Sequence, residues 1–160
     1  MRLLIALKHI GDLEKKVSEL YGKFSELFLD DYEASRFFDN MSKDELSHGD
    51  MVAFQIRLVN KNPVLFEDVD IDMNEIATLV SRINEILKSE LKPALEEAIN
   101  IALEIENNAS EFHYRKAITI SNPDMAKLLK GLGKSDEEHR DQIANFANKR
   151  GIIYILEETL

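Results

Sequence analysis

Residues 34–59 read ASRFFDNMSKDELSHGDMVAFQIRLV, a stretch with an apolar pattern of helical period that is broken at its centre. The inward positions of a bundle helix recur in alternating steps of three and four. Here they are Ala34, Phe38, Met41, Glu45, His48, Val52, Gln55 (or Ile56) and Val59. Glu45 and His48 therefore stand where apolar side chains are expected. Their spacing of three places both on one face of the helix.

Three further stretches of helical period are interrupted in the same way. Glu14 breaks the first and Glu106 the third. The fourth contains a carboxylate followed three residues later by histidine, Asp136 and His139. Because buried carboxylates without partners cost several kcal/mol each, a layer of them indicates that cations sit between them.

Two divalent ions would balance four carboxylates, and oxygen and imidazole ligands without sulfur suit iron or manganese. The sequence therefore predicts a site for two iron ions, with manganese or a mixed pair as alternatives. The predicted metal ligands are Glu14, Glu45, His48, Glu106, Asp136 and His139.

The same periodicity predicts an all-α fold in a single domain, residues 1–160. Long helices are expected over residues 3–29, 31–60, 93–119 and 123–149, with Pro93 in the first turn of the third and Gly151 just beyond the fourth. A connection over 61–72 and a further helix over 73–91 separate the second from the third. Two short-loop pairs joined by a long crossover is the connectivity of a ferritin-like four-helix bundle. Whether residues 73–91 pack as a fifth helix or lie across the bundle stays open.

Composition excludes several classes of protein. The chain has no cysteine, which removes disulfides, thiolate zinc sites and iron–sulfur clusters. Its net charge of −10 argues against a nucleic-acid partner, because phosphate binding needs a basic face. The apolar start, MRLLIALKHIG, is interrupted by Lys8 and His9, and no stretch is long enough to span a membrane. Cytoplasmic residence is the expectation.

An internal repeat relates the two halves of the chain. The separation of Glu14 from Glu45 matches that of Glu106 from Asp136 to within one residue. The segment EKKVSELY, which starts at Glu14, also parallels ENNASEFHY, which starts at Glu106. The halves read as two copies of one helical hairpin around a paired site.

On these residues the chain resembles the rubrerythrin family of ferritin-like di-iron proteins. The resemblance rests on four segments: Glu14 to Tyr21, Glu45 to His48, Glu106 to Tyr114, and Asp136 to His139. It implies that Glu45 and Asp136 bridge the metals. It further implies that Glu14, Glu106, His48 and His139 are terminal ligands. Tyr21 and Tyr114 would orient the carboxylates by hydrogen bonds.

The chain departs from that family at three points. Asp136 replaces the usual Glu, Ala109 replaces a further glutamate, and the cysteine-containing rubredoxin-like module is missing. The resemblance implies a non-haem di-iron oxidoreductase, a peroxidase or ferroxidase acting on peroxide or O2. Its catalytic residues would be Glu14, Glu45, Glu106, Tyr21 and Tyr114. Electrons would come from an external redox partner protein.

Two alternatives remain open. In the first, the chain is a non-catalytic helical binding or scaffold module that inherited a degenerate metal site. A subunit of a hollow iron-storage shell is the other alternative. A homodimer is expected for the chain itself, with Ile152, Ile153, Tyr154 and Ile155 as candidate interface residues.

Overall fold

The structure, a computed structural model, describes residues 2–66, 73–108 and 135–155. Within these ranges every regular element is helical, so the predicted all-α class is confirmed. The elements are α1 (Arg2–Leu27), α2 (Tyr32–Lys61), the short 3-10 helix η1 (Pro63–Leu65), α3 (Met73–Lys88), α4 (Leu95–Asn107) and α7 (Ser135–Lys149). None of the described helices is both long and apolar enough to cross a membrane.

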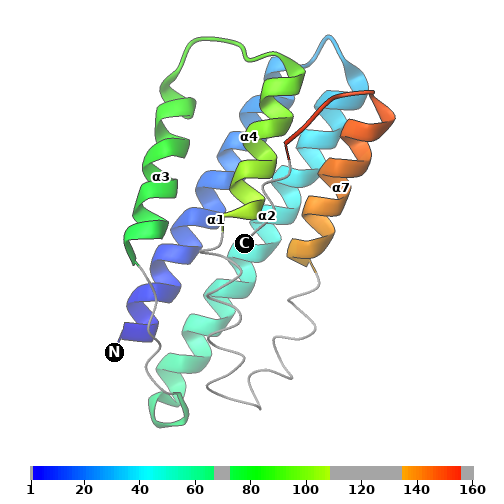
Figure 1. The fold of residues 1–160 in the computed structure, drawn as a ribbon. Helices are drawn as coiled ribbons and strands as arrows, with labels where there is room; N and C mark the ends of the chain where they lie inside the picture. The colour runs from blue at the N-terminus through cyan, green and yellow to red at the C-terminus, as the bar shows by residue number, and fades with distance from the viewer. Residues whose placement is uncertain (1, 67–72, 109–134, 156–160) are drawn as a thin grey trace.

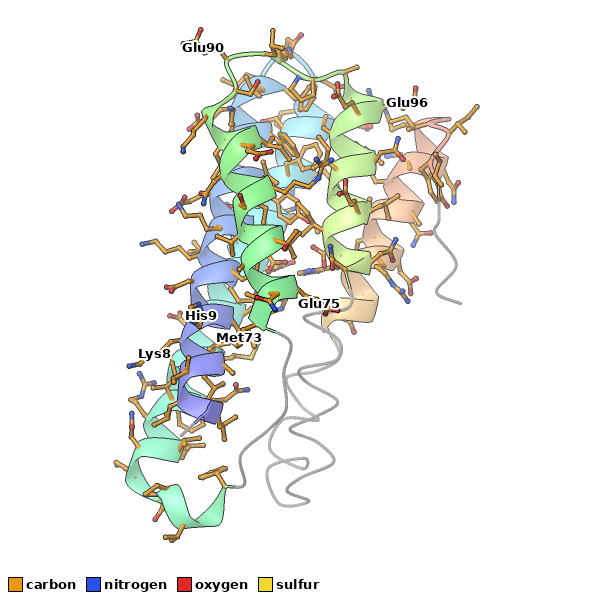
Figure 2. The ribbon with its side chains drawn as sticks, turned by 60° about the vertical axis from the view of Figure 1, so that its left-hand side comes forward. Lys8, His9, Met73, Glu75, Glu90 and Glu96 are labelled. Carbon is orange, nitrogen blue, oxygen red and sulfur yellow. The ribbon has the colours of Figure 1, made fainter. Side chains whose placement is uncertain are left out.

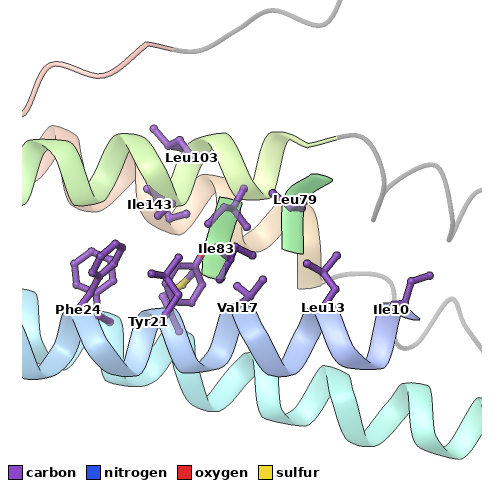
Figure 3. Close-up of a cluster of buried hydrophobic side chains, with 14 of the residues drawn as sticks. Ile10, Leu13, Val17, Tyr21, Phe24, Leu79, Ile83, Leu103 and Ile143 are labelled. Atoms are coloured by element: carbon purple, nitrogen blue, oxygen red, sulfur yellow. The ribbon is translucent and has the colours of Figure 1, made fainter. Parts of the chain in front are cut away.

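Among the described α-helices, four lie side by side and α3 packs on their outside. α1, α2, α4 and α7 run along a common direction, while α3 lies against α1 (Figure 1). The buried face of α3 consists of Ile76, Leu79 and Ile83, and in Figure 3 the last two face Leu13 and Val17 of α1. The helix predicted over 73–91 is therefore present as α3 and packs on α1, but it ends at Lys88, three residues before the predicted end.

The α1–α2 hairpin forms because its turn and its contact face agree. Asp31 is the N-cap of α2, and its carboxylate accepts a hydrogen bond of 3.1 Å from the Ala34 N–H. Further along, the Ser18 and Ser42 hydroxyls each donate to the other residue's carbonyl over 2.9 Å. These reciprocal bonds fix how far α1 is shifted along α2.

The aromatic side chains gather near the turn between α1 and α2. Phe38 is fully buried, and its ring centre lies 5.1 Å from that of Phe24 and 5.9 Å from that of Phe28. Phe37 stacks on Phe146 of α7 with ring centres 4.3 Å apart. Rings at these separations attract each other in addition to the apolar area they remove from water.

A lysine holds the C-terminal end of α3. Lys23 of α1 donates from Nζ to the carbonyl oxygens of Ile86, Leu87 and Ser89 over 3.0, 3.0 and 2.6 Å. The last carbonyls of a helix have no partner within the helix and carry partial negative charge, so a cation there is stabilising. Lys23 thus fastens α3 to α1.

Both predicted ends of the helix expected over 93–119 are wrong. Pro93 does not lie in the first turn of α4, which begins at Leu95 after the N-cap residue Ala94. The single helix expected as far as Thr119 ends at Asn107, because Asn108 has extended backbone angles. The expected start of the last helix at Pro123 lies outside the described residues.

The end of α7 follows the prediction. The helix stops at Lys149, and Gly151 has a positive φ of 64°, a backbone conformation that glycine adopts without strain. Of the candidate interface residues, Ile152 and Tyr154 pack against the core. Ile153 and Ile155 point outward, with exposed fractions of 82% and 76%.

Candidate metal centre

α2 supplies the central pair of the site. Glu45 and His48 lie on its buried face, each with an exposed fraction of 2%. His48 Nδ1 lies 3.1 Å from Glu45 Oε2, a contact that their spacing of three along the helix allows. The break in the apolar pattern of α2 is therefore a buried ionisable pair.

α1 and α4 each add one buried carboxylate. Glu14 Oε2 lies 3.7 Å from His48 Nδ1. Glu106 accepts a hydrogen bond of 2.7 Å at Oε1 from the hydroxyl of Tyr21, which is itself fully buried. Tyr21 therefore links α1 to α4 and fixes the orientation of the Glu106 carboxylate.

α7 contributes His139, whose exposed fraction is 2%. Its Nδ1 lies 2.8 Å from Glu45 Oε1 and 3.7 Å from Glu106 Oε2. The nearer oxygen is within ion-pair distance but off the direction of a hydrogen bond, so Nδ1 has no hydrogen-bond partner in the described part of the chain. On the other side of the ring, Nε2 lies 3.7 Å from Asp44 Oδ2.

The two imidazoles share one carboxylate. Oε2 of Glu45 faces His48 and Oε1 faces His139, while the two ring centres lie 5.0 Å apart. Glu14 lies beside the first imidazole and Glu106 beside the second, each at 3.7 Å. The arrangement is two similar groups, each with one histidine and one outer glutamate, joined through Glu45.

The electrostatics show what this burial costs without a cation. Burial, with the nearby Glu45 charge adding to it, raises the pKa of Glu14 to about 7 despite its contact with His48. Burial also raises the pKa of Glu45. Burial alone would lower the pKa of His139, but its interactions with Glu106 and Glu45 outweigh this and raise the pKa to about 11. In the metal-free chain, bound protons therefore offset the negative charge of this layer in place of a metal ion.

The donor set fits a metal ion. Glu45, His48 and His139 each offer a ligand atom, and these atoms all lie within 4.8 Å of one another. Carboxylate oxygen and imidazole nitrogen are ligands for iron, manganese and zinc alike. The Nδ1 of His139, buried among carboxylates, is an atom whose lone pair a cation would satisfy. This buried group could hold a metal ion.

Two predicted site residues lie partly or wholly outside the described residues. Asp136 is on the α7 helix three residues before His139, the spacing that places two residues on one face. Its side chain, and Tyr114 altogether, lie outside the described residues. The structure brings together the other predicted ligands, which are Glu14, Glu45, His48, Glu106 and His139.

Sequence reasoning missed the polar residues around this group. Asp44 is adjacent to Glu45 in sequence and half exposed, so it lies off the inward pattern, yet it faces His139 of another helix. Ser18 and Ser42 lie close in sequence to Glu14 and Glu45 and join their two helices. In the sequence, these residues are marked only by lying within a few positions of a predicted ligand, and many residues without a role in the site do the same.

A comparison of the chain with protein families, curated proteins and solved structures finds no match.

Proposed function

We propose that the chain is a ferritin-like, rubrerythrin-like di-iron oxidoreductase that reduces peroxide or O2 with electrons from another protein. One observation supports it above all. The two oxygens of the buried Glu45 carboxylate face two different buried imidazoles. A carboxylate shared in this way is what a pair of metal ions requires as a bridge.

The ligands divide between two positions. Glu14 and His48 would hold one ion, and Glu106 and His139 the other, with Glu45 common to both. Asp136 is the proposed second bridge, contributed by α7. Four carboxylates would then balance the charge of two divalent ions, so neither charge would remain uncompensated in the interior.

Iron bound here would supply the one-electron oxidation and reduction that side chains of this composition lack. Reduction of one peroxide molecule to two waters takes two electrons and two protons, and an external donor protein supplies the electrons. The chain itself excludes bulk water, since Glu14, Glu45, His48 and His139 are all almost completely buried. The hydrogen bond from Tyr21 to Oε1 of Glu106 leaves Oε2 facing His139.

The test is iron content per chain after anaerobic loading with Fe(II), followed by the absorbance spectrum on adding peroxide. We expect about two irons per chain in the wild type, and loss of both binding and turnover in Glu45→Gln and His48→Asn. Matched controls are Glu75→Gln and His9→Asn, because both residues are exposed on the outer surface near the start of α3 (Figure 2). These two variants should load iron as the wild type does.

Wild-type protein that binds no iron would contradict the proposal. The chain would then be better described as a non-catalytic helical module. Iron binding that survives in Glu45→Gln at full stoichiometry would contradict the shared role of Glu45. Binding without peroxide or O2 reduction would remove the oxidoreductase assignment and leave a metal-binding bundle.

A further inference from the structure

Asp44 is a half-exposed acidic residue at the edge of the buried site. It lies on α2 directly before Glu45, and half of its side chain is exposed to solvent. Its Oδ2 lies 3.7 Å from Nε2 of His139, while the opposite ring nitrogen faces Glu45 and Glu106. The ring of His139 is therefore flanked by carboxylates at both nitrogens.

A neutral imidazole that binds a cation through Nδ1 carries its proton on Nε2. An acceptor on that side fixes the rotation of the ring and keeps the Nδ1 lone pair directed at the ion. A separation of 3.7 Å is longer than a direct hydrogen bond. A small rotation of the half-exposed Asp44 side chain would bring the two atoms to hydrogen-bond distance.

The internal repeat of the sequence predicts a difference in residue type between the two halves at this position. Glu45 corresponds to Asp136 in the repeat, so Asp44 corresponds to Ser135. The residue type at this position is therefore a carboxylate in one half and a hydroxyl in the other. A charged acceptor holds a metal-bound imidazole more firmly than a neutral one.

We propose that Asp44 is a positioning residue for His139, and that it makes the position formed by Glu45, Glu106 and His139 the first of the two to fill. This inference rests on the proposed metal site. The two positions then differ in their affinity for a metal ion, and Asp44 causes the difference.

The test measures Co(II) binding, with Co(II) as a coloured probe, in two single-histidine backgrounds. Only the His139 position remains in His48→Ala, and only the His48 position remains in His139→Ala. We expect Asp44→Ala to weaken Co(II) binding by about ten- to hundred-fold in the first background and to leave it unchanged in the second. Asp44→Asn should restore part of the affinity, since its amide oxygen still accepts a hydrogen bond.

The matched control is Asp50→Ala, which removes an exposed carboxylate six residues further along α2. It should not change Co(II) binding in either background. Equal weakening by Asp44→Ala in both backgrounds would overturn the proposal, because it would show a general effect of charge. If His139→Ala bound its first Co(II) equivalent as tightly as the wild type does, the filling order would also be overturned.

A second readout separates this inference from the proposed function. The ring ¹⁵N chemical shifts of His139, measured by NMR in the metal-free protein, should move in Asp44→Ala and stay unchanged in Asp50→Ala. Unchanged shifts in Asp44→Ala would overturn the positioning role even if metal binds. Wild-type protein that binds neither Co(II) nor Fe(II) would overturn the proposed function and, with it, the filling order.

Discussion

The buried face of α2 contains two regions with opposite energetics. Phe38, near the start of the helix, lies among other aromatic rings, and Glu45 and His48, near its middle, lie among carboxylates. All three are almost completely buried. Burial of the aromatic cluster stabilises the fold at about 25 cal/mol per Å² of apolar surface. Burial of the ionisable layer costs free energy until a cation or a proton offsets the charge.

The difference indicates that the fold and the site are supported separately. The aromatic end, the Ser18–Ser42 pair and the Lys23 contact hold the helices together by interactions that need no bound metal ion. The ionisable layer is then presented by a framework that other residues stabilise. On the proposed function, this framework would keep its helices folded whether the ionisable layer holds protons or metal ions.

The largest expected effect comes from breaking the aromatic side of this comparison. Phe38→Ala should lower the free energy of unfolding by about 3–5 kcal/mol, because it leaves a cavity between Phe24 and Phe28. Urea denaturation of the metal-free protein, followed by circular dichroism, measures the change. The loss should be the same in the metal-loaded protein.

The control for this substitution is Phe54→Ala on the same helix. The exposed fraction of Phe54 is 41%, so its removal should cost less than about 1 kcal/mol. If Phe38→Ala and Phe54→Ala had similar effects, the aromatic cluster would not be the part of the molecule that stabilises the fold.

The second effect concerns the ionisable side and depends on pH. In the folded chain the pKa of Glu14 is about 7, compared with an ordinary value of 4.5. Between these values the folded chain keeps a proton that the unfolded chain releases. Its contribution to stability is therefore full below pH 4.5 and is lost as pH rises towards 7. The loss is on the order of 3 kcal/mol.

Thermal unfolding of the metal-free protein at a series of pH values measures this dependence. The raised pKa of Glu45 acts in the same direction. Glu14→Gln should flatten the curve over this interval, since glutamine does not titrate. Metal loading should stabilise the protein more as pH rises, because ligands must lose their protons to bind. If the stability of the wild type changed with pH as little as that of Glu14→Gln, burial would not raise the pKa of Glu14 as described.

The sequence predicts every buried position of α2, because the spacing of apolar residues along a packed helix determines which side chains face the core. Each of the eight inward positions of α2, including Gln55 in preference to Ile56, is buried. The predicted end of the third helix fails, because the apolar period of the sequence continues past Asn108 and no proline or glycine stands there. The asparagine at this position is a local sign of a helix end, but it is a weaker one than glycine.

The residues of the candidate site likewise divide into those that the sequence could predict and those that it could not. Glu14, Glu45, His48, Glu106 and His139 could be predicted because a charge at an inward position is conspicuous. Contacts made by exposed or half-buried residues across helices could not, because they depend on how the helices are placed in space. Asp44 beside His139 and Lys23 beside the end of α3 both belong to this kind.

A smaller effect tests one of the contacts that support the framework. Lys23→Met should lower the free energy of unfolding by about 1–2 kcal/mol, because the carbonyls of Ile86, Leu87 and Ser89 lose their cationic donor while the apolar stem is kept. Urea denaturation measures the change. Lys16→Met is the control, since Lys16 makes a surface pair with Glu19 and should change stability by under about 0.5 kcal/mol. Equal effects would show that Lys23 does not fasten α3.

The smallest expected effect concerns Arg150, which pairs through both terminal nitrogens with Asp31 and so joins the end of α7 to the start of α2. Arg150→Gln should cost less than about 1 kcal/mol, because solvent and salt screen this partly exposed pair. Its hydrogen bonds lower the pKa of Asp31 to about 2. The stabilisation is therefore present above the ordinary pKa of 3.8 and is lost as pH falls towards 2.

The difference in stability between wild type and Arg150→Gln should accordingly shrink in 1 M salt and at pH near 2, when followed by thermal unfolding. Lys149→Gln is the control, since the Lys149 side chain is 70% exposed and its contact with Glu33 is long at 3.4 Å. A difference that persists in high salt would mean that Arg150 acts through packing on Phe146, whose ring centre lies 5.7 Å from its guanidinium. In that case Arg150 would belong to the aromatic region, and the tie between α7 and α2 would be apolar in origin.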